Sequence, residues 1–72
     1  MLTFPRLLDV VALTDDRPEH GLVRGQVGTV VEVLSADVFE VEFSDDLGQT
    51  YASLAVPARE LLVLHHRRSM VA

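Results

Sequence analysis

The clearest alternation of hydrophobic and polar residues lies in the segment VFEVEF. Phe39, Val41 and Phe43 occupy one set of alternate positions, and Glu40 and Glu42 occupy the other. Successive side chains of a β-strand point to opposite faces of the sheet. The pattern therefore predicts a strand with an apolar core face and a glutamate face in solvent.

Four other segments also have the composition of strands, being rich in valine, leucine and other apolar residues between polar stretches. Short polar segments separate the last four strands, which is typical of antiparallel hairpins. The predicted strands are Leu7–Leu13, Val27–Leu34, Val38–Phe43, Gln49–Val56 and Leu61–Leu64. The chain is therefore predicted to be all-β.

The segment that follows Pro57 has two interpretations. Helix-forming residues continue from Pro57 to Arg68, with histidines and arginines at the end of a helix that favours cations. Alternatively, Pro57–Glu60 forms one helical turn and Leu61–Leu64 forms a closing strand. We favour the strand, because a fifth strand helps to close a small barrel whose four strands would otherwise leave two open edges.

Three glycines precede the second predicted strand, in the sequence HGLVRGQVGTVVEV. Glycine permits positive φ angles and close backbone approach, whereas the following valines favour a pleated strand. Residues Thr14–His20 are polar and contain Pro18, and they are predicted to form a long loop that continues through the glycines to about Gln26. A loop of this length in a small domain is often functional.

The chain has 72 residues and no cysteine, and 49% of its residues are hydrophobic. These values indicate one folded domain, residues 1–72, without disulfides or thiolate metal sites. We interpret residues 1–6 as an N-terminal arm and residues 66–72 as a tail. No signal peptide or membrane-spanning run is recognised, and we expect a cytoplasmic protein.

The formal net charge is −5, and the chain contains arginine but no lysine. Binding to nucleic acid requires a cationic surface that displaces counterions from phosphates. The charge therefore favours a protein partner, in particular a basic one, over nucleic acid or a membrane. Exposed strand edges also offer a route to a homodimer.

The segments DVVAL, EHGLVRGQVGTVVEV, FEVEFSD and YASLAVPARELLVL occur in this order along the chain. In this respect the chain resembles an uncharacterised bacterial family of short stand-alone SH3-like proteins, a domain-of-unknown-function family. The resemblance extends from Leu8 to His65. It implies a small SH3-like barrel of about five antiparallel strands, with one short helical turn before the last strand, and no established activity.

Two weaker resemblances imply different functions. The element GLVRGQVGTVVEV is similar to the glycine-valine element of KOW-type barrels, which implies contact with RNA or ribosomal partners through Arg17, Arg24 and Arg59. A similar glycine element in the β-subunit of nitrile hydratase implies an accessory subunit of a metalloenzyme.

Catalytic and metal-binding interpretations find little support in the sequence. The acidic residues of the loops lack calcium-loop spacing, and the adjacent residues His65 and His66 would point to opposite sides of a strand. No nucleophile elbow or phosphate-binding loop is present. The chain is therefore predicted to be neither an enzyme nor a cofactor-binding protein.

Surface recognition remains as the predicted role. Long loops on rigid scaffolds often carry function, and arginine and tyrosine are frequent in the energetic centres of interfaces. The predicted partner-binding residues are Arg17, Glu19, His20, Leu22, Arg24, Glu40, Glu42 and Tyr51. Our leading hypothesis is a non-catalytic protein-binding module, such as the acidic regulatory or antitoxin-like partner of a co-encoded protein.

Overall fold

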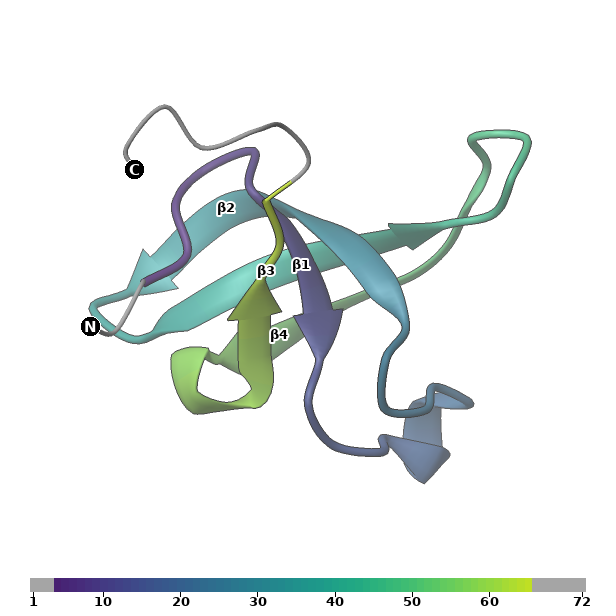
Figure 1. Ribbon diagram of the computed structural model, residues 1–72, viewed down its shortest axis with the longest axis horizontal. Coiled ribbons are helices and arrows are strands. Elements are labelled where there is room, and N and C mark those ends of the chain that lie inside the picture. Colours follow the sequence, from purple (N-terminus) through teal and green to yellow (C-terminus); the bar gives the residue numbers. More distant parts are fainter. Residues whose placement is uncertain (1–3, 66–72) are drawn as a thin grey trace.

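Five β-strands and two short 3₁₀ turns make up the protein in a computed structural model, which describes residues 4–65 (Figure 1). No α-helix occurs among these residues, and none of the described elements is a helix long and apolar enough to cross a bilayer. The elements are β1 (Val10–Leu13), η1 (Pro18–His20), β2 (Val27–Ser35), β3 (Val38–Ser44), β4 (Thr50–Pro57), η2 (Ala58–Glu60) and β5 (Leu61–Val63). The predicted all-β class is confirmed.

The five strands form one antiparallel sheet in the order β4-β3-β2-β1-β5. Strands β2, β3 and β4 are joined in sequence by hairpins. β1 lies on the other side of β2 from β3, and β5 lies next to β1 at the edge of the sheet (Figure 1). The last strand pairs with β1 and not with β4. It therefore extends the sheet, and the hydrogen-bonded ladder is open between β4 and β5.

The core consists of the inward-facing residues of all five strands and one loop residue. Phe39, Val41 and Phe43 are buried on one face of β3, as their alternation predicts. The remaining buried hydrophobic residues of the core cluster are Val11, Leu13, Leu22, Val30, Leu54, Val56 and Leu61. Burial of these aliphatic and aromatic side chains stabilises the fold by the hydrophobic effect.

The first strand begins later than the sequence pattern predicts. It starts at Val10 rather than at Leu7, because Leu7 and Leu8 form an exposed turn. Leu8 has a φ angle of 71°, which a strand residue does not adopt. The strand predicted from the apolar run LLDVVAL is therefore three residues too long at its start, since hydrophobicity alone does not reveal a turn.

The glycines before β2 serve two different purposes. Gly21 and Gly25 have positive φ angles of 69° and 93°, in the region where glycine is least strained. Gly28 instead lies buried within β2. A Cβ atom there would lie 2.7 Å from Val41 Cγ1 and 2.9 Å from the Glu42 carbonyl oxygen. Close packing of β2 on β3 therefore requires glycine at this position.

The chain after β4 adopts the turn-plus-strand arrangement. η2 follows Pro57 directly, and Leu61–Val63 then pairs with Leu13–Val11 of β1. The prediction of a strand rather than a helix is therefore correct, with the strand ending one residue earlier, but this strand pairs with β1 and does not close the sheet onto β4. Residues 66–68 of the alternative helix lie outside the described residues, as do residues 1–3 of the predicted arm and the predicted tail.

The long loop between β1 and β2 is held close to the sheet. Arg17 and Leu22 form an isolated β-bridge around η1, with the Arg17 amide donating to the Leu22 carbonyl at 2.8 Å. The Arg17 guanidinium also donates to Glu60 Oε1 in η2, at 2.7 Å and 3.0 Å. The predicted loop therefore has a defined path, which is fixed at both ends and in the middle.

Candidate protein-binding face

The outer face of strands β2, β3 and β4 carries three glutamates, and we call Glu32, Glu40 and Glu42 the acidic face. Glu40 and Glu42 project from β3 on the side opposite the buried aromatic residues. Glu32 joins them because a β-bulge shifts the register between Val30 and Glu32. Without that bulge, Val31 would oppose Glu40, so the irregularity decides which side chain completes the face.

Two of these carboxylates lie directly across from each other. Glu32 and Glu40 are register partners on β2 and β3, a position where like charges are destabilising. Within residues 4–65, no arginine or histidine lies within ion-pair distance of any of the three glutamates. The Ser53 hydroxyl on β4 donates to Glu40 Oε2 at 2.6 Å and orients that carboxylate. The face therefore concentrates negative charge that the described part of the chain does not neutralise.

A tyrosine and a glutamine form a hydrogen bond near the start of β4. Tyr51 is half-exposed on β4, two residues before Ser53, and its hydroxyl accepts a hydrogen bond from Gln26 Nε2 at 2.9 Å. Gln26 precedes β2, so this bond crosses the end of β3. The bond holds the phenol ring in place, and an exposed ring of this kind can pack against the hydrocarbon stem of a basic side chain.

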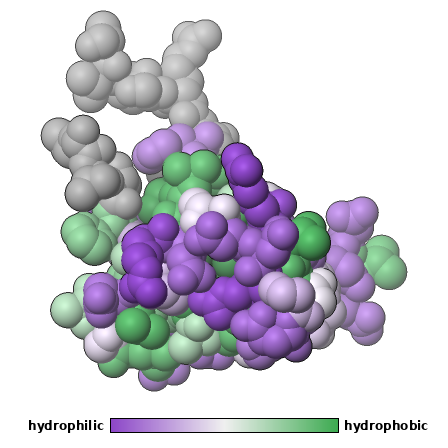
Figure 2. All heavy atoms as spheres, turned by 90° about the horizontal axis from the view of Figure 1, so that it is seen from below, coloured by the Kyte–Doolittle hydropathy of each residue, from purple (hydrophilic) through white to green (hydrophobic). Residues whose placement is uncertain are grey.

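The loop residues of the predicted binding surface fall into separate environments. The Arg17 side chain is 19% exposed and is engaged by Glu60, whose side chain is 20% exposed. Glu19 and His20 are exposed on η1, and Glu19 lies 4.0 Å from Arg17. Hydrophilic residues cover most of the middle of the surface on the side where the loop lies, as Figure 2 shows.

One predicted binding residue is misplaced by the sequence analysis. Leu22 is 1% exposed and packs in the core cluster, so the expectation that it lies on the surface is wrong. The physical reason is the β-bridge at Arg17, which turns the loop back on itself and directs this leucine inward. Arg24 does remain exposed, and its amide donates to Asp16 Oδ1 at 2.8 Å.

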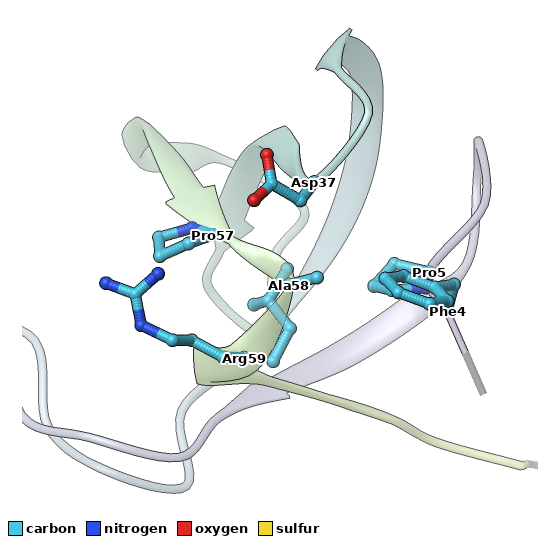
Figure 3. A pocket seen from close by; sticks show the side chains of 7 residues that line it. Phe4, Pro5, Asp37, Pro57, Ala58 and Arg59 are labelled. Atoms are coloured by element: carbon cyan, nitrogen blue, oxygen red, sulfur yellow. The ribbon is translucent and has the colours of Figure 1, made fainter. Parts of the chain in front are cut away.

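A pocket of about 400 Å³ opens beside the end of β4 (Figure 3). Phe4 and Pro5 form one side, and Pro57 and Arg59 form the other, with Ala58 between them and Asp37 at the rim. Its lining is mainly apolar, and the Ala58 amide donates to the Asp37 carbonyl at 2.7 Å beneath it. The sequence analysis did not identify this pocket, since it joins three segments far apart in the chain.

The polar side chains of the described residues are either at least partly exposed or paired. No group of three histidine, cysteine, aspartate or glutamate side chains in residues 4–65 is placed to hold a metal ion. Every fully buried side-chain nitrogen or oxygen atom in this part of the chain has a hydrogen-bond partner. The notable feature is an exposed charged face rather than an enclosed polar site.

The comparison with protein families gives one result. Residues 7–63 match the model of the domain of unknown function DUF4926. The chain belongs to the DUF4926 family. A search of curated proteins and a search of solved structures each found no match.

The DUF4926 match contains all five strands and all three glutamates of the acidic face. It leaves out Phe4 and Pro5, which form one side of the pocket. The expected membership of an uncharacterised domain family is therefore confirmed, and the family itself carries no assigned activity.

Glu32 is not among the predicted binding residues, although one feature of the sequence indicates that it is exposed. It is the single charged residue within the apolar run VVEVL, where a buried strand would carry valine or leucine. Its position opposite Glu40 depends on the bulge at Val31, which no alternation pattern reveals. A charged residue inside a valine-rich strand is thus a useful sign of an exposed second face.

Proposed function

We propose that this DUF4926 domain is a non-catalytic protein-binding module whose acidic face receives the basic side chains of a partner protein. The observation that carries the proposal is the pair Glu32 and Glu40, placed directly opposite each other without a cation from the described chain. Such an arrangement costs stability in the isolated domain. A partner that brings arginine or lysine to the face reverses that cost.

Charge complementarity would determine how such a partner binds. Complementary charged surfaces accelerate association and select against partners with the wrong charge. Tyr51 adds an aromatic contact near the start of β4, and its orientation by Gln26 reduces the entropy lost on binding. The three carboxylates and this ring together form a surface suited to a basic segment or a basic protein surface.

The partner we favour is a basic protein encoded beside this one, with the domain acting as a cytoplasmic regulatory or antitoxin-like protein in a bacterium. A small acidic domain can occupy the basic surface with which a nuclease holds its nucleic acid. The chain's net charge of −5 supports this interpretation. The fold supports it as well, because an SH3-like barrel, which the strand order and the 3₁₀ turn before β5 favour, is a common scaffold for binding.

The test is recovery of a stoichiometric partner by the tagged domain from extracts of its native host. The face variant Glu32→Gln/Glu40→Gln/Glu42→Gln should lose the partner or retain it only at low ionic strength. A matched control, Asp15→Asn/Asp16→Asn/Asp46→Asn, removes the same number of charges from exposed loop positions outside the predicted binding residues. It should bind like the unmodified domain.

Two outcomes would reject the proposal. One is failure to recover any stoichiometric partner at low and physiological salt. The other is equal loss of the partner by the face variant and its control, because net charge rather than the acidic face would then govern binding. Thermal unfolding of each variant establishes that the loss does not arise from unfolding.

Contact with RNA has less support from the geometry. Of the three arginines that this function would use, Arg17 is already bonded to Glu60 and is mostly buried. A titration of labelled RNA at low salt distinguishes the two functions, since phosphate binding weakens steeply as salt rises. An accessory role in a metalloenzyme would instead yield a large enzyme in the same recovery experiment.

A further inference from the structure

The outer edge of β4 is unusually open to pairing with another strand. β4 has eight residues and pairs only with β3, so its other side carries backbone N–H and C=O groups that bond to nothing in residues 4–65. Its sequence, TYASLAVP, has no charged residue, and its proline stands at the end. Protein edges are ordinarily protected by charges, internal prolines or bulges.

The other free edges of the sheet do have such protection. β5 has only three residues. The end of β2 beyond Val30 is interrupted by two register shifts, which bend a strand away from regular pairing. β4 pairs regularly with β3 over residues 52–57, and Tyr51 is an extra residue that forms a bulge opposite the step from Phe43 to Ser44. Residues 52–57 of β4 therefore form a regular free edge that is longer than β5 and carries no charged side chain.

We propose that two copies of this domain pair through their β4 strands, antiparallel and related by a twofold axis near Ser53. In this register Ala52 faces Leu54 of the second copy, and Tyr51, at the bulge, lies next to Ala55. The side chains along the middle of the junction are small and uncharged, so the two strands approach without steric or charge conflict. The proposal stands apart from the acidic face, because it uses the strand edge and not the glutamates.

The charges at the two ends of β4 complement each other in this arrangement. Asp45 and Asp46 lie in the hairpin just before β4, whereas Arg59 lies just after it. Antiparallel pairing brings the start of one β4 beside the end of the other. The side chain of Arg59 is 78% exposed, and its contact with Glu60 is long, at 3.9 Å. It is therefore available to the aspartates of the second copy.

The same pairing accounts for an exposed leucine at the tip of the β3–β4 hairpin. Leu47 is 88% exposed, although Asp45 Oδ1 fixes the loop by accepting from the amides of Leu47 and Gln49, each at 2.9 Å. In the proposed pairing the hairpin tip that carries Leu47 lies towards the end of β4 of the second copy, where η2 begins. Arg59, Pro57 and Ala58 line the apolar pocket, so the leucine of one copy lies beside the pocket of the other.

Repulsion between the two acidic faces does not prevent the pairing. Glu42 is the register partner of Ser53, so Glu42 and its counterpart would be separated by three strand spacings, or about 14 Å, and the two Glu40 side chains would lie farther apart. The Debye length at physiological ionic strength is about 8 Å, so the repulsion between them is largely screened. Each Glu40 also keeps its hydrogen bond from Ser53 of the same copy. The dimer would present the two faces as one continuous acidic surface.

Sedimentation equilibrium over a wide range of protein concentration tests the proposal. The monomer has a mass of 8.0 kDa, and the average mass should rise with concentration towards twice that value. The variant Tyr51→Lys/Ala55→Lys places lysines opposite each other at both contacts of the junction, and its dissociation constant should rise roughly tenfold. The control Val33→Lys/Leu34→Lys carries the same charge on β2 and should dimerise normally.

A charge-swap experiment tests the register. Mixing Tyr51→Lys/Ala55→Lys with Tyr51→Glu/Ala55→Glu should restore the dimer that each variant forms only weakly alone, and Leu47→Ser should weaken the unmodified dimer. Far-UV circular dichroism verifies that each variant is folded. A monomer at all concentrations, a dissociation constant that the β4 lysines leave unchanged, or a mixture that binds no more tightly than either variant alone would each overturn the proposal.

Discussion

The loop between β1 and β2 and the outer face of β2, β3 and β4 are both rich in polar residues, yet they use them differently. In the loop, Arg17 bonds to Glu60 and Leu22 fills the core, so these side chains hold the fold together. On the sheet, Glu32 and Glu40 face each other without a cation from the described residues. Polar composition does not separate side chains that hold a loop to the core from side chains that carry unpaired charge, whereas the contacts of each side chain do.

Of the variants that compare the loop with the outer face of the sheet, Leu22→Ala should cause the largest loss of stability. Truncation to alanine leaves a cavity in the core and should reduce the free energy of unfolding by about 2–5 kcal/mol. Small domains have total stabilities near the lower part of the range of roughly 5–15 kcal/mol, so the variant should be largely unfolded on warming.

Its neighbour provides the matched control for that measurement. Val23 is exposed in the same loop, and Val23→Ala should change the free energy of unfolding by no more than about 0.5 kcal/mol. Urea denaturation followed by circular dichroism measures both variants. Similar small effects for the two would show that the loop is not part of the core.

Gly28 should give the next largest effect, and it tests the packing beneath the acidic face. Gly28→Ala places a methyl group 2.9 Å from a backbone oxygen of β3, and overpacking of this kind costs about 1–3 kcal/mol. At Gly25 alanine meets no neighbouring atom, but its positive φ angle should still cost about 1 kcal/mol. Thermal unfolding of the two variants ranks the costs, and a larger loss at Gly25 would contradict the close approach of β2 and β3.

The ion pair between the loop and η2 should have an intermediate effect. Arg17→Met should destabilise the protein by about 1–2 kcal/mol, because a partly buried pair lies between the values for exposed pairs and for fully buried ones. Arg24→Met, at an exposed position in the same loop, should cost less than about 0.5 kcal/mol.

A double-mutant cycle isolates the interaction itself. Arg17→Met/Glu60→Gln should cost less than the sum of the two single variants, because each single variant leaves one charge without its partner. Chemical denaturation of the four proteins provides the data. Additive effects would mean that the guanidinium and the carboxylate do not stabilise each other.

The smallest effect should be a gain in stability on the acidic face. Glu32→Gln removes a like-charged cross-strand pair and should stabilise the domain by about 0.2–1 kcal/mol, most clearly at low salt. Glu19→Gln on the loop removes the same charge without relieving such a pair, and we expect no gain. Unfolding measured at several salt concentrations compares them, and a destabilised Glu32→Gln variant would show that this carboxylate is compensated.

The regular strands were predictable because each has a repeating pattern with a direct physical meaning. The alternation in VFEVEF determines which side of β3 is buried. The short polar segments mark where the hairpin strands end and turn. The beginning of β1 was not predictable, since Leu7 and Leu8 are as hydrophobic as the strand that follows them. Their turn depends on a backbone conformation that hydrophobicity does not encode.

The candidate site was predictable only in part. Glu40 and Glu42 follow from the period of two, whereas Glu32 needs a bulge one residue before it to lie opposite Glu40. The burial of Leu22 depends on the bridge that returns the loop to the sheet, and the pocket depends on three segments that meet only in the folded chain. Each of these features arises from contacts between residues distant in the sequence.

The sequence by itself determined the all-β class, the two faces of β3 and the negative charge, because these depend on local period and composition. Only the tertiary structure decided which loop residues stabilise the core, which glutamates lie together and which strand edge is left open. The physical reason is that strand register and loop path are set by long-range hydrogen bonds and packing, and a single shifted residue moves a side chain to a new partner.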